Sequence, residues 1–445
     1  MRATSIKAIL VAAGLIFPAW SFAQTKSKDA AAYANRGVAK LQKRDWDGAI
    51  ADFNRALQFD PKLAKAYLDR GIAKTNKGDR DGAIADYNRA LQLDPRLATA
   101  YQARGIAKLQ KNDFDGAIAD FDRALQFDPK LAKAYVDRGL AKRGKCELTT
   151  YGGVGDFVSD YTFGSRKVLK RELVGAIADF NRALQLDPKN ANAYRNRGIA
   201  KIELGDLNGA IADYNRALQF DPKFAAAYVN RGLAKQEKGD LDSAIVDYNR
   251  AFELNPKLGW AYVDRGSAKL LKSDAAGAIG DFNRALELDP KLIGAYSGRG
   301  SANFLARNWP AALRDYRRFC ELSPRLQEYP RLFIWIIRSR LGEREAANKE
   351  LSTNFTTAQG SWQFKVKAYL LGNLAEADFL AAASSPDAKS DRRQHCEALF
   401  YGGMKNLLNG NKPAATEFFK KCLATEEKSV VEYDLAKAEL KALGQ

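Results

Sequence analysis

A 34-residue period is the feature of this sequence that most limits what the chain can fold into. Prolines recur at this interval in two series, separated by one gap that exceeds the period by 25 residues. The two series are Pro61, Pro95 and Pro129, then Pro188, Pro222, Pro256, Pro290 and Pro324. A fixed period of this length predicts an array of small helical or strand units that bury their apolar faces by stacking on one another.

Each period reads as two helices joined by a turn. The eight repeats begin at residues 30, 64, 98, 132, 191, 225, 259 and 293, and the fourth is the enlarged one. Within a repeat, Tyr at position 4, Gly at 8 and Ala at 10 recur in the first half, and Ala at 20 and an aromatic residue at 24 recur in the second. Spacings of three and four place these residues on one helical stripe. The proline at position 32 ends the second helix, because it lacks a backbone donor.

These residues resemble the tetratricopeptide repeat (TPR), a 34-residue helix–turn–helix unit, across residues 30–326. The resemblance implies an all-α, right-handed superhelix (an α-solenoid) whose concave groove is lined by the first helix of each repeat. It also implies a non-catalytic scaffold that binds other proteins.

One departure from the family recurs in every repeat: position 7, usually Leu, is Arg, and position 23 is Asp. Positions whose numbers sum to about 30 lie opposite each other in an antiparallel helix pair, so we expect an Arg–Asp ladder inside the array. Structural ion pairs are the favoured interpretation, and a ligand-binding role is the alternative. The expected pairs are Arg36–Asp52, Arg70–Asp86, Arg104–Asp120, Arg138–Asp179, Arg197–Asp213, Arg231–Asp247, Arg265–Asp281 and Arg299–Asp315.

The resemblance places positions 2, 5, 6, 9, 12 and 13 of each repeat on the groove. Positions 5 and 9 are rich in Val, Ile and Leu, which a solvent-facing surface does not need, so they predict a bound partner. Polar residues at positions 2 and 6 suit hydrogen bonds to a peptide or helical segment. Packing of position 9 between neighbouring repeats is the alternative. The predicted groove residues are Lys65, Leu68, Ile72, Gln102, Ile106, Lys133, Val136, Leu140, Arg195, Asn196, Ile199, Val229, Asn230, Leu233, Trp260 and Val263.

The 25 surplus residues fall between the two helices of the fourth repeat, within 143–174, and predict an enlarged turn that projects from one edge. Its aromatic residues have no place in the repeat core, and the alternation in "DFVSDYTF" suggests a short hairpin. These residues are Tyr151, Phe157, Tyr161 and Phe163. The segment is interpreted either as an arm that contacts the client or as an inert loop.

Beyond residue 326 the spacing loosens, and residues 327–445 read as degenerate helical repeats. Residues 396–429 recover TPR spacing, and a solvated capping helix is expected after them. Residues 296–445 resemble bacterial envelope TPR proteins, including lipoproteins of the NlpI type, which implies envelope proteases or cell-wall enzymes as partners. Cys396 and Cys422 fall near the same end of the last pair, which predicts a disulfide, with two buried thiols as the alternative.

The first 23 residues read as a signal peptide. Arg2 and Lys7 precede an apolar run that is too short to cross a membrane, and small residues lead to an expected cleavage near Ala23. The mature chain, residues 24–445, is therefore expected in the periplasm or outside the cell, with no transmembrane segment. The favoured function is an envelope adaptor. A structural subunit or a homo-oligomer, packed through convex or terminal surfaces, is the alternative.

Charge and chemistry exclude other classes of function. Lys and Arg total 71 against 53 acidic residues, but the two signs are interleaved, so no nucleic-acid partner is expected. His395 is the only histidine, the four cysteines match no metal spacing, and "YGGVGDF" is no phosphate-binding loop. We therefore expect no catalytic residue, no metal and no cofactor.

Overall fold

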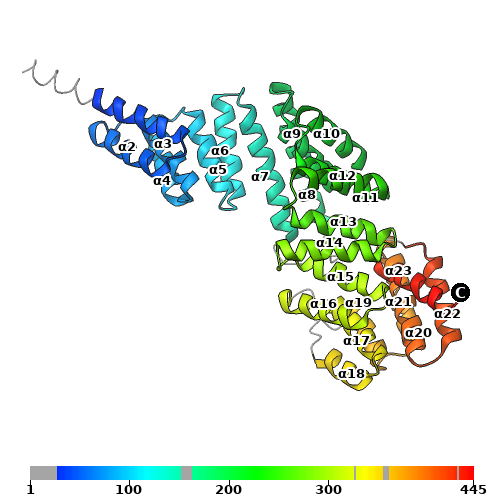
Figure 1. Ribbon diagram of the computed structural model, residues 1–445. Helices are drawn as coiled ribbons and strands as arrows, with labels where there is room; N and C mark the ends of the chain where they lie inside the picture. Colours follow the sequence, from blue (N-terminus) through cyan, green and yellow to red (C-terminus); the bar gives the residue numbers. More distant parts are fainter. Residues whose placement is uncertain (1–27, 152–162, 325–326, 354–359, 428–429) are drawn as a thin grey trace, which may run out of the picture. The chain divides into compact units, whose positions relative to one another are not determined.

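In the computed structural model the protein is described for residues 28–151, 163–324, 327–353, 360–427 and 430–445 (Figure 1). These residues form α-helices joined by short turns, and no strand occurs among them. Consecutive helices pack as antiparallel pairs, so the predicted α-solenoid of TPR pairs is confirmed. The described residues divide into an N-terminal module, residues 28–151 with 163–220, and a C-terminal module, residues 221–445.

The N-terminal module contains the first five repeats. It comprises a helix that includes residues 28–42, then α2 (Trp46–Phe59), α3 (Ala64–Lys77), α4 (Arg80–Leu93), α5 (Ala98–Leu109), α6 (Phe114–Phe127), α7 (Ala132–Tyr151), α8 (Phe163–Leu186), α9 (Ala191–Glu203) and α10 (Leu207–Phe220).

The C-terminal module contains the last three repeats and the helices that follow them. The repeats comprise α11 (Ala225–Glu237), α12 (Leu241–Leu254), α13 (Gly259–Leu271), α14 (Ala275–Leu288), α15 (Ile293–Leu305) and α16 (Trp309–Leu322). After them come α17 (Glu328–Arg340), α18 (Arg344–Thr353), α19 (Trp362–Leu370), α20 (Glu376–Ala381), α21 (Ala388–Leu408), α22 (Lys412–Ala424) and α23 (Val431–Ala442).

Local sequence sets where the second helix of a repeat begins and ends. In α14, the Asp274 side chain accepts a hydrogen bond from the backbone N–H of Gly277, which satisfies a donor that the first turn leaves free. At the other end Asp289 is extended, as the proline that follows it requires. Local capping signals therefore set where α14 begins and ends.

The close approach of the two helices depends on the glycine at position 8. In the seventh repeat, a Cβ atom on Gly266 would lie 2.8 Å from Cε1 of Phe282, whose ring is fully buried. Seven other repeats place the aromatic residue of position 24 over the same glycine. The ring thus occupies the space that a side chain at position 8 would need.

Replacing Gly266 with Ala is expected to lower the free energy of unfolding by about 1–3 kcal/mol, because the buried Phe282 ring must move. Gly280 on α14 is the matched control, since a Cβ atom there meets nothing within 4 Å. Gly280→Ala is expected to raise stability by about 0.5–1 kcal/mol through helix propensity. Urea unfolding followed by circular dichroism measures both, and equal effects of the two substitutions would contradict the packing role of Gly266.

The insertion in the fourth repeat differs from the predicted enlarged turn. Its residues lengthen both helices, so that α7 has 20 residues and α8 has 24, whereas α4 has 14. The reason is packing. Cys146 on α7 and Leu173 on α8 are buried in one apolar cluster, and this burial stabilises the added turns of both helices. The predicted hairpin falls on residues 152–162, outside the described residues, as do Phe157 and Tyr161. Tyr151 ends α7 and Phe163 begins α8, but their side chains lie outside the described part.

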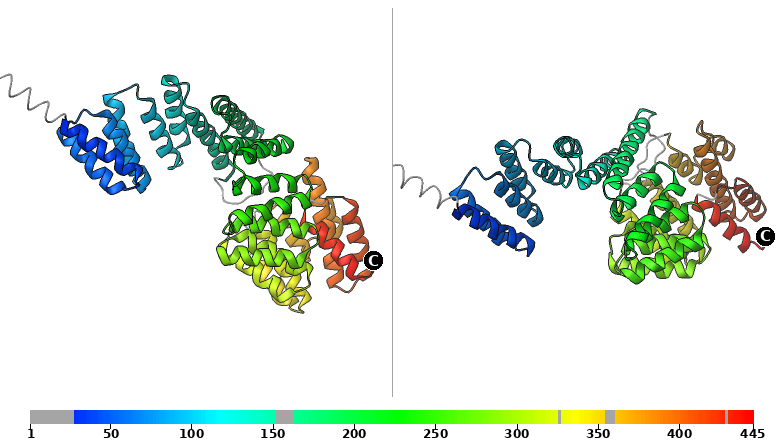
Figure 2. Two further views of the ribbon diagram at one scale, coloured as in Figure 1. Left: turned by 45° about the horizontal axis from the view of Figure 1, so that its top comes forward. Right: turned by 90° about the horizontal axis from the view of Figure 1, so that it is seen from above.

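The helices after the last repeat build the largest apolar core of the C-terminal module. Every residue from Leu332 to Ile337 on α17 is buried, and α19, α21, α22 and α23 contribute to the same cluster. Both views of Figure 2 show α21–α23, in orange to red, against the yellow-green helices of this module. The predicted solvated last helix is wrong in one respect: one face of α23, including Leu435 and Leu440, is buried in this core.

Candidate partner-binding site

The predicted Arg–Asp ladder is present, and the seventh repeat shows its geometry. Arg265 donates from Nε and Nη2 to the two carboxylate oxygens of Asp281, at 2.9 and 2.5 Å. Lys269 lies 2.9 Å from the same carboxylate. Arg265 also donates from Nη1 to Oδ1 of Asn249 in the preceding repeat, at 2.6 Å, and its guanidinium lies over the ring of Tyr262. Arg265 thus joins the two helices of its own repeat and ties them to the repeat before.

The same Arg–Asp pair is formed in all eight repeats, with the aspartate buried each time. In the first repeat the hydrogen bond from Arg36 holds the pKa of Asp52 below its usual value. In the first seven repeats a lysine at position 11 forms a second ion pair with the aspartate. This lysine recurs at the 34-residue interval, so the sequence could have revealed it. In the eighth, Asn303 donates to Asp315 instead. Since both carboxylate oxygens are occupied, the structural interpretation of the ladder is favoured over ligand binding.

The predicted groove residues lie on the first helices, but their exposure differs from the expectation. Position 5 was expected to face solvent, yet Leu68, Val136 and Val229 are buried. The reason is that neighbouring first helices pack directly against one another and cover this position. The prediction that position 5 forms an exposed apolar strip is therefore wrong for these three residues.

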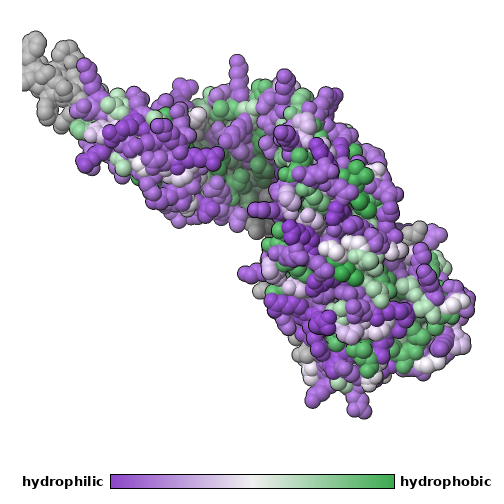
Figure 3. All heavy atoms as spheres, in the orientation of Figure 1, coloured by the Kyte–Doolittle hydropathy of each residue, from purple (hydrophilic) through white to green (hydrophobic). Residues whose placement is uncertain are grey.

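The remaining predicted residues divide by exposure. Asn196 is also buried, and the exposed ones are Lys65, Lys133 and Trp260. The half-buried ones are Ile72, Gln102, Ile106, Leu140, Arg195, Ile199, Asn230, Leu233 and Val263. In the N-terminal module these residues come together on α3, α5, α7 and α9, and in the C-terminal module on α11 and α13, because first helices of successive repeats are in contact. Figure 3 shows hydrophobic residues gathered in a recess beside α7.

Carboxyl groups at position 6 make the groove face of the first helices partly acidic. Asp137 accepts a hydrogen bond from Nε2 of Gln102 at 3.0 Å, and burial raises its pKa. Burial alone raises the pKa of Asp264 to about 7. Trp260 precedes Asp264 by one helical turn on α13, so an exposed aromatic ring and a partly desolvated carboxyl share one face of that helix.

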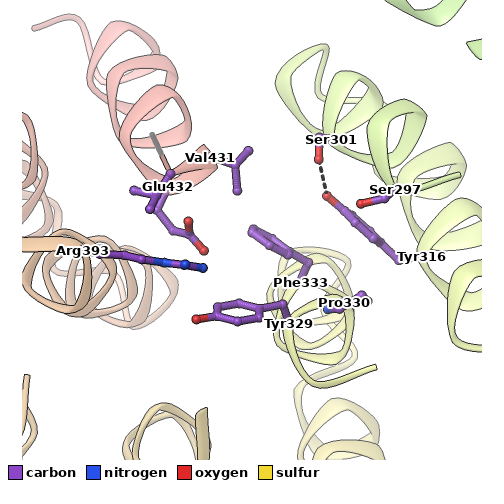
Figure 4. A pocket seen from close by; sticks show the side chains of 10 residues that line it. Ser297, Ser301, Tyr316, Tyr329, Pro330, Phe333, Arg393, Val431 and Glu432 are labelled. Atoms are coloured by element: carbon purple, nitrogen blue, oxygen red, sulfur yellow. Dashed lines mark hydrogen bonds between the residues drawn. The ribbon is translucent and has the colours of Figure 1, made fainter. Parts of the chain in front are cut away.

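A cavity of about 270 Å³ lies in the C-terminal module, where α17, α21 and α23 meet the first helix of the last repeat (Figure 4). Ser297 and Ser301, at positions 5 and 9 of that repeat, line one side. The other lining residues are Tyr316, Tyr329, Pro330, Phe333, Arg393, Val430, Val431 and Glu432. Sequence reasoning missed this cavity, since its residues are spread over five helices. The only signal was the change from aliphatic residues to serine at positions 5 and 9.

Cys396 and Cys422 lie in the same hairpin, α21 and α22, as the spacing indicated. They are buried thiols with their Sγ atoms 3.2 Å apart. Their mutual hydrogen bond lowers the pKa of Cys396 and raises that of Cys422. A disulfide between them stays a prediction.

Within the described residues, no group of three or more His, Cys, Asp or Glu side chains is placed to hold a metal ion. No helix there combines the length and the apolar character that crossing a membrane demands.

Comparison with known proteins identifies the repeats. The family description "Tetratricopeptide repeat" matches residues 36–108, 98–131 and 225–258, and "TPR repeat" matches residues 170–201 and 200–239. These segments include the ladder and the position-8 glycines of the first, second, third, fifth and sixth repeats. No curated protein sequence matches this chain.

Solved TPR structures are similar over part of the chain. A crystal structure of MamA protein is 27% identical, covers 44% of this chain and 94% of its own, and has a TM-score of 0.35. YrrB, described as a TPR protein with an unusual peptide-binding site, is 20% identical, covers 47% and 95%, and has a TM-score of 0.35. A tetratricopeptide repeat protein from Parabacteroides merdae is 17% identical, covers 61% and 98%, and has a TM-score of 0.46.

Proposed function

From this array of tetratricopeptide repeats, we propose that the protein is a non-catalytic scaffold that binds a segment of a client protein along its first helices. The observation that carries the proposal is Trp260 on α13, the first helix of the seventh repeat, which is 44% exposed. Half-buried Val263 lies on the same helix, and half-buried Leu233 lies on α11, the first helix of the preceding repeat. Exposed aromatic rings beside aliphatic residues are the usual anchors of protein–protein interfaces.

The bacterial cell envelope is the proposed location. The support is the signal-peptide pattern of residues 1–23 and the resemblance of residues 296–445 to envelope TPR proteins. Under this proposal the clients are envelope proteins such as proteases or cell-wall enzymes.

A second candidate is a structural subunit that packs through the second helices, either in an envelope complex or as a homo-oligomer. The observation that favours it is Val246 on α12, which is 64% exposed. Val246 replaces the smaller residue found at position 22 of most repeats. An apolar side chain left in solvent at this place suits contact through the second-helix face.

Trp260 and Val246 therefore make a matched pair of tests. Trp260→Glu is expected to reduce client capture at least tenfold, because it puts a charge where an aromatic anchor would be buried. Val246→Glu is the control and is expected to leave capture unchanged. Both substitutions are at exposed positions, so neither should disturb folding.

The measurement is crosslinking in intact cells, followed by quantification of each captured protein against the unsubstituted chain. Loss of capture by Val246→Glu, with Trp260→Glu unaffected, would contradict the scaffold proposal and support the structural subunit.

A further inference from the structure

The cavity in the C-terminal module is small and built by five helices. At about 270 Å³ it is below the roughly 300–1,000 Å³ of pockets that enclose whole drug-sized ligands. It therefore suits one functional group, such as the end of a side chain or a small molecule. In Figure 4, Arg393, Glu432 and Tyr329 surround one side of it, and Ser297, Ser301 and Tyr316 surround the other.

Glu397 lies beside the cavity, and its charge is fully compensated. It accepts hydrogen bonds from the Tyr329 hydroxyl at 2.9 Å and from Trp362 Nε1 at 2.6 Å. Arg393 donates from Nε to the other oxygen at 2.9 Å and forms the ion pair. One arginine and one carboxylate therefore neutralise each other at this place.

Glu432 is the second carboxyl of the cavity, and it is 3% exposed. The Tyr401 hydroxyl donates to it at 3.3 Å, but within the described residues no Lys, Arg or His forms an ion pair with it. Burial and the nearby charge of Glu397 raise the pKa of Glu432 to about 8. At neutral pH the carboxyl is thus mostly protonated.

The groups around Glu432 come from four helices. The titratable ones that face it are Tyr316 on α16, Tyr329 on α17, Arg393, Cys396, Glu397 and Tyr401 on α21, and Cys422 on α22. Only Arg393 among them is a cation. Its ion pair is with Glu397, and its charge lowers the pKa of Glu432 less than burial and Glu397 raise it. If Glu397 and Glu432 were both ionised, these two carboxylates and Arg393 would together carry one excess negative charge. A single proton or a single bound cation removes that charge.

The rest of the wall suits a cation. The rings of Tyr316 and Phe333 are stacked at 5.4 Å between centroids, and both line the cavity with Tyr329. An aromatic ring attracts a cation to its face. The hydroxyls of Ser297 and Ser301 offer acceptor oxygens, and the Ser301 hydroxyl lies 3.1 Å from that of Tyr316.

We propose that this cavity binds a primary ammonium group, from a lysine side chain or a small amine, through an ion pair with Glu432. Binding is an exchange of cations. The Glu432 carboxyl releases its proton to solvent, and the incoming ammonium, which keeps its own three protons, neutralises the resulting carboxylate. Lysine of a bound client as the source rests on the proposed scaffold function, whereas the ammonium site itself does not.

This exchange gives binding a defined pH dependence. Below pH 8 each unit of increase in pH is expected to strengthen ammonium binding about tenfold, because more of Glu432 is ionised. The affinity should level off near pH 8 and fall above about pH 10, where the amine loses its own charge. A carboxylate guest held by Arg393 and protonated Glu432 would show the opposite trend.

The test is calorimetric titration of the full chain with n-butylamine, Nα-acetyl-lysinamide and butyrate at pH 6, 7 and 8. Both amines are expected to bind more tightly as the pH rises, and butyrate is not expected to bind. Glu432→Gln keeps the shape and removes the charge, so it should weaken amine binding at least tenfold and abolish the pH dependence. Glu417→Gln, at an exposed position on α22, is the matched control and should change nothing.

The two amines distinguish the sources. Binding of Nα-acetyl-lysinamide supports a client lysine, whereas binding of n-butylamine alone supports a free amine. Unchanged amine binding in Glu432→Gln, or binding of butyrate that strengthens as the pH falls, would overturn the proposal. Ser301→Ala, expected to weaken amine binding severalfold, provides a second variant if Glu432→Gln unfolds. Because no client is used, failure of this site is distinguishable from failure of the scaffold proposal.

Discussion

Replacing Asp281 with Ala is expected to lower the free energy of unfolding of the C-terminal module by about 3 kcal/mol, the low end of what losing one partner of a buried ion pair costs. The Asp281 side chain is 6% exposed and holds both Arg265 and Lys269. Its loss leaves two cations in a place where solvent reaches only about a fifth of each side chain. That partial exposure is why the low end of the range applies.

The chain supplies a control of the same residue type. Asp242 forms an ion pair with Lys272, but its side chain is 82% exposed, so Asp242→Ala is expected to cost less than about 1 kcal/mol. Guanidinium chloride unfolding compares the two variants. Hydrogen exchange should show the loss of protection centred on α13 and α14, because repeat arrays lose stability locally. Equal losses in the two variants would mean that the ladder contributes no more than a surface ion pair.

Replacing Glu439 with Ala is the second large effect, and it is expected to free the last helix. The Glu439 side chain is 4% exposed and accepts from Arg340 at 2.6 Å and from Arg307 at 3.1 Å. Arg340 is itself largely buried, and its desolvation lowers its pKa. Removing the shared carboxylate should therefore cost about 3–5 kcal/mol.

The consequence is specific to α23, because Glu439 is its polar attachment to the last repeat and to α17. Limited proteolysis should cut the C-terminal 18 or so residues much faster in Glu439→Ala than in the unsubstituted chain. The matched control is Lys437→Ala, an exposed position on the same helix. Amine binding should also be lost in Glu439→Ala, since Glu432 leaves with α23. Unchanged proteolysis would show that the apolar face of α23 suffices to hold it.

The repeat itself could be predicted almost completely from the sequence. Position-8 glycine under a position-24 aromatic, and position-7 arginine opposite position-23 aspartate, follow from helix geometry within one repeat. Each of these contacts links residues only 16 apart in the regular repeats, for example Gly266 with Phe282 and Arg265 with Asp281. A pattern repeated eight times at such short range leaves little room for another arrangement.

The errors concern contacts between elements that the period does not specify. Val229 reads as a surface residue when one helix is considered alone, but the first helix of the next repeat buries it. The helices on both sides of the insertion are longer than the repeat predicts, because Cys146 and Leu173 are buried between them. The apolar face of α23 has the same origin, since it forms only against the core built by α17 and α21.

By itself, the sequence determined the helix pairs, their boundaries in the regular repeats and the buried ladder, because those interactions are local and repeat at a fixed interval. The tertiary structure alone decided which face of each first helix remains exposed and where the chain after the last repeat docks. It also decided the surroundings of Glu432, whose neighbours Ser297, Tyr329 and Arg393 lie between 39 and 135 residues earlier in the chain. The pKa of a carboxyl is raised when residues distant in the sequence bury it away from water. A local sequence pattern does not show that burial.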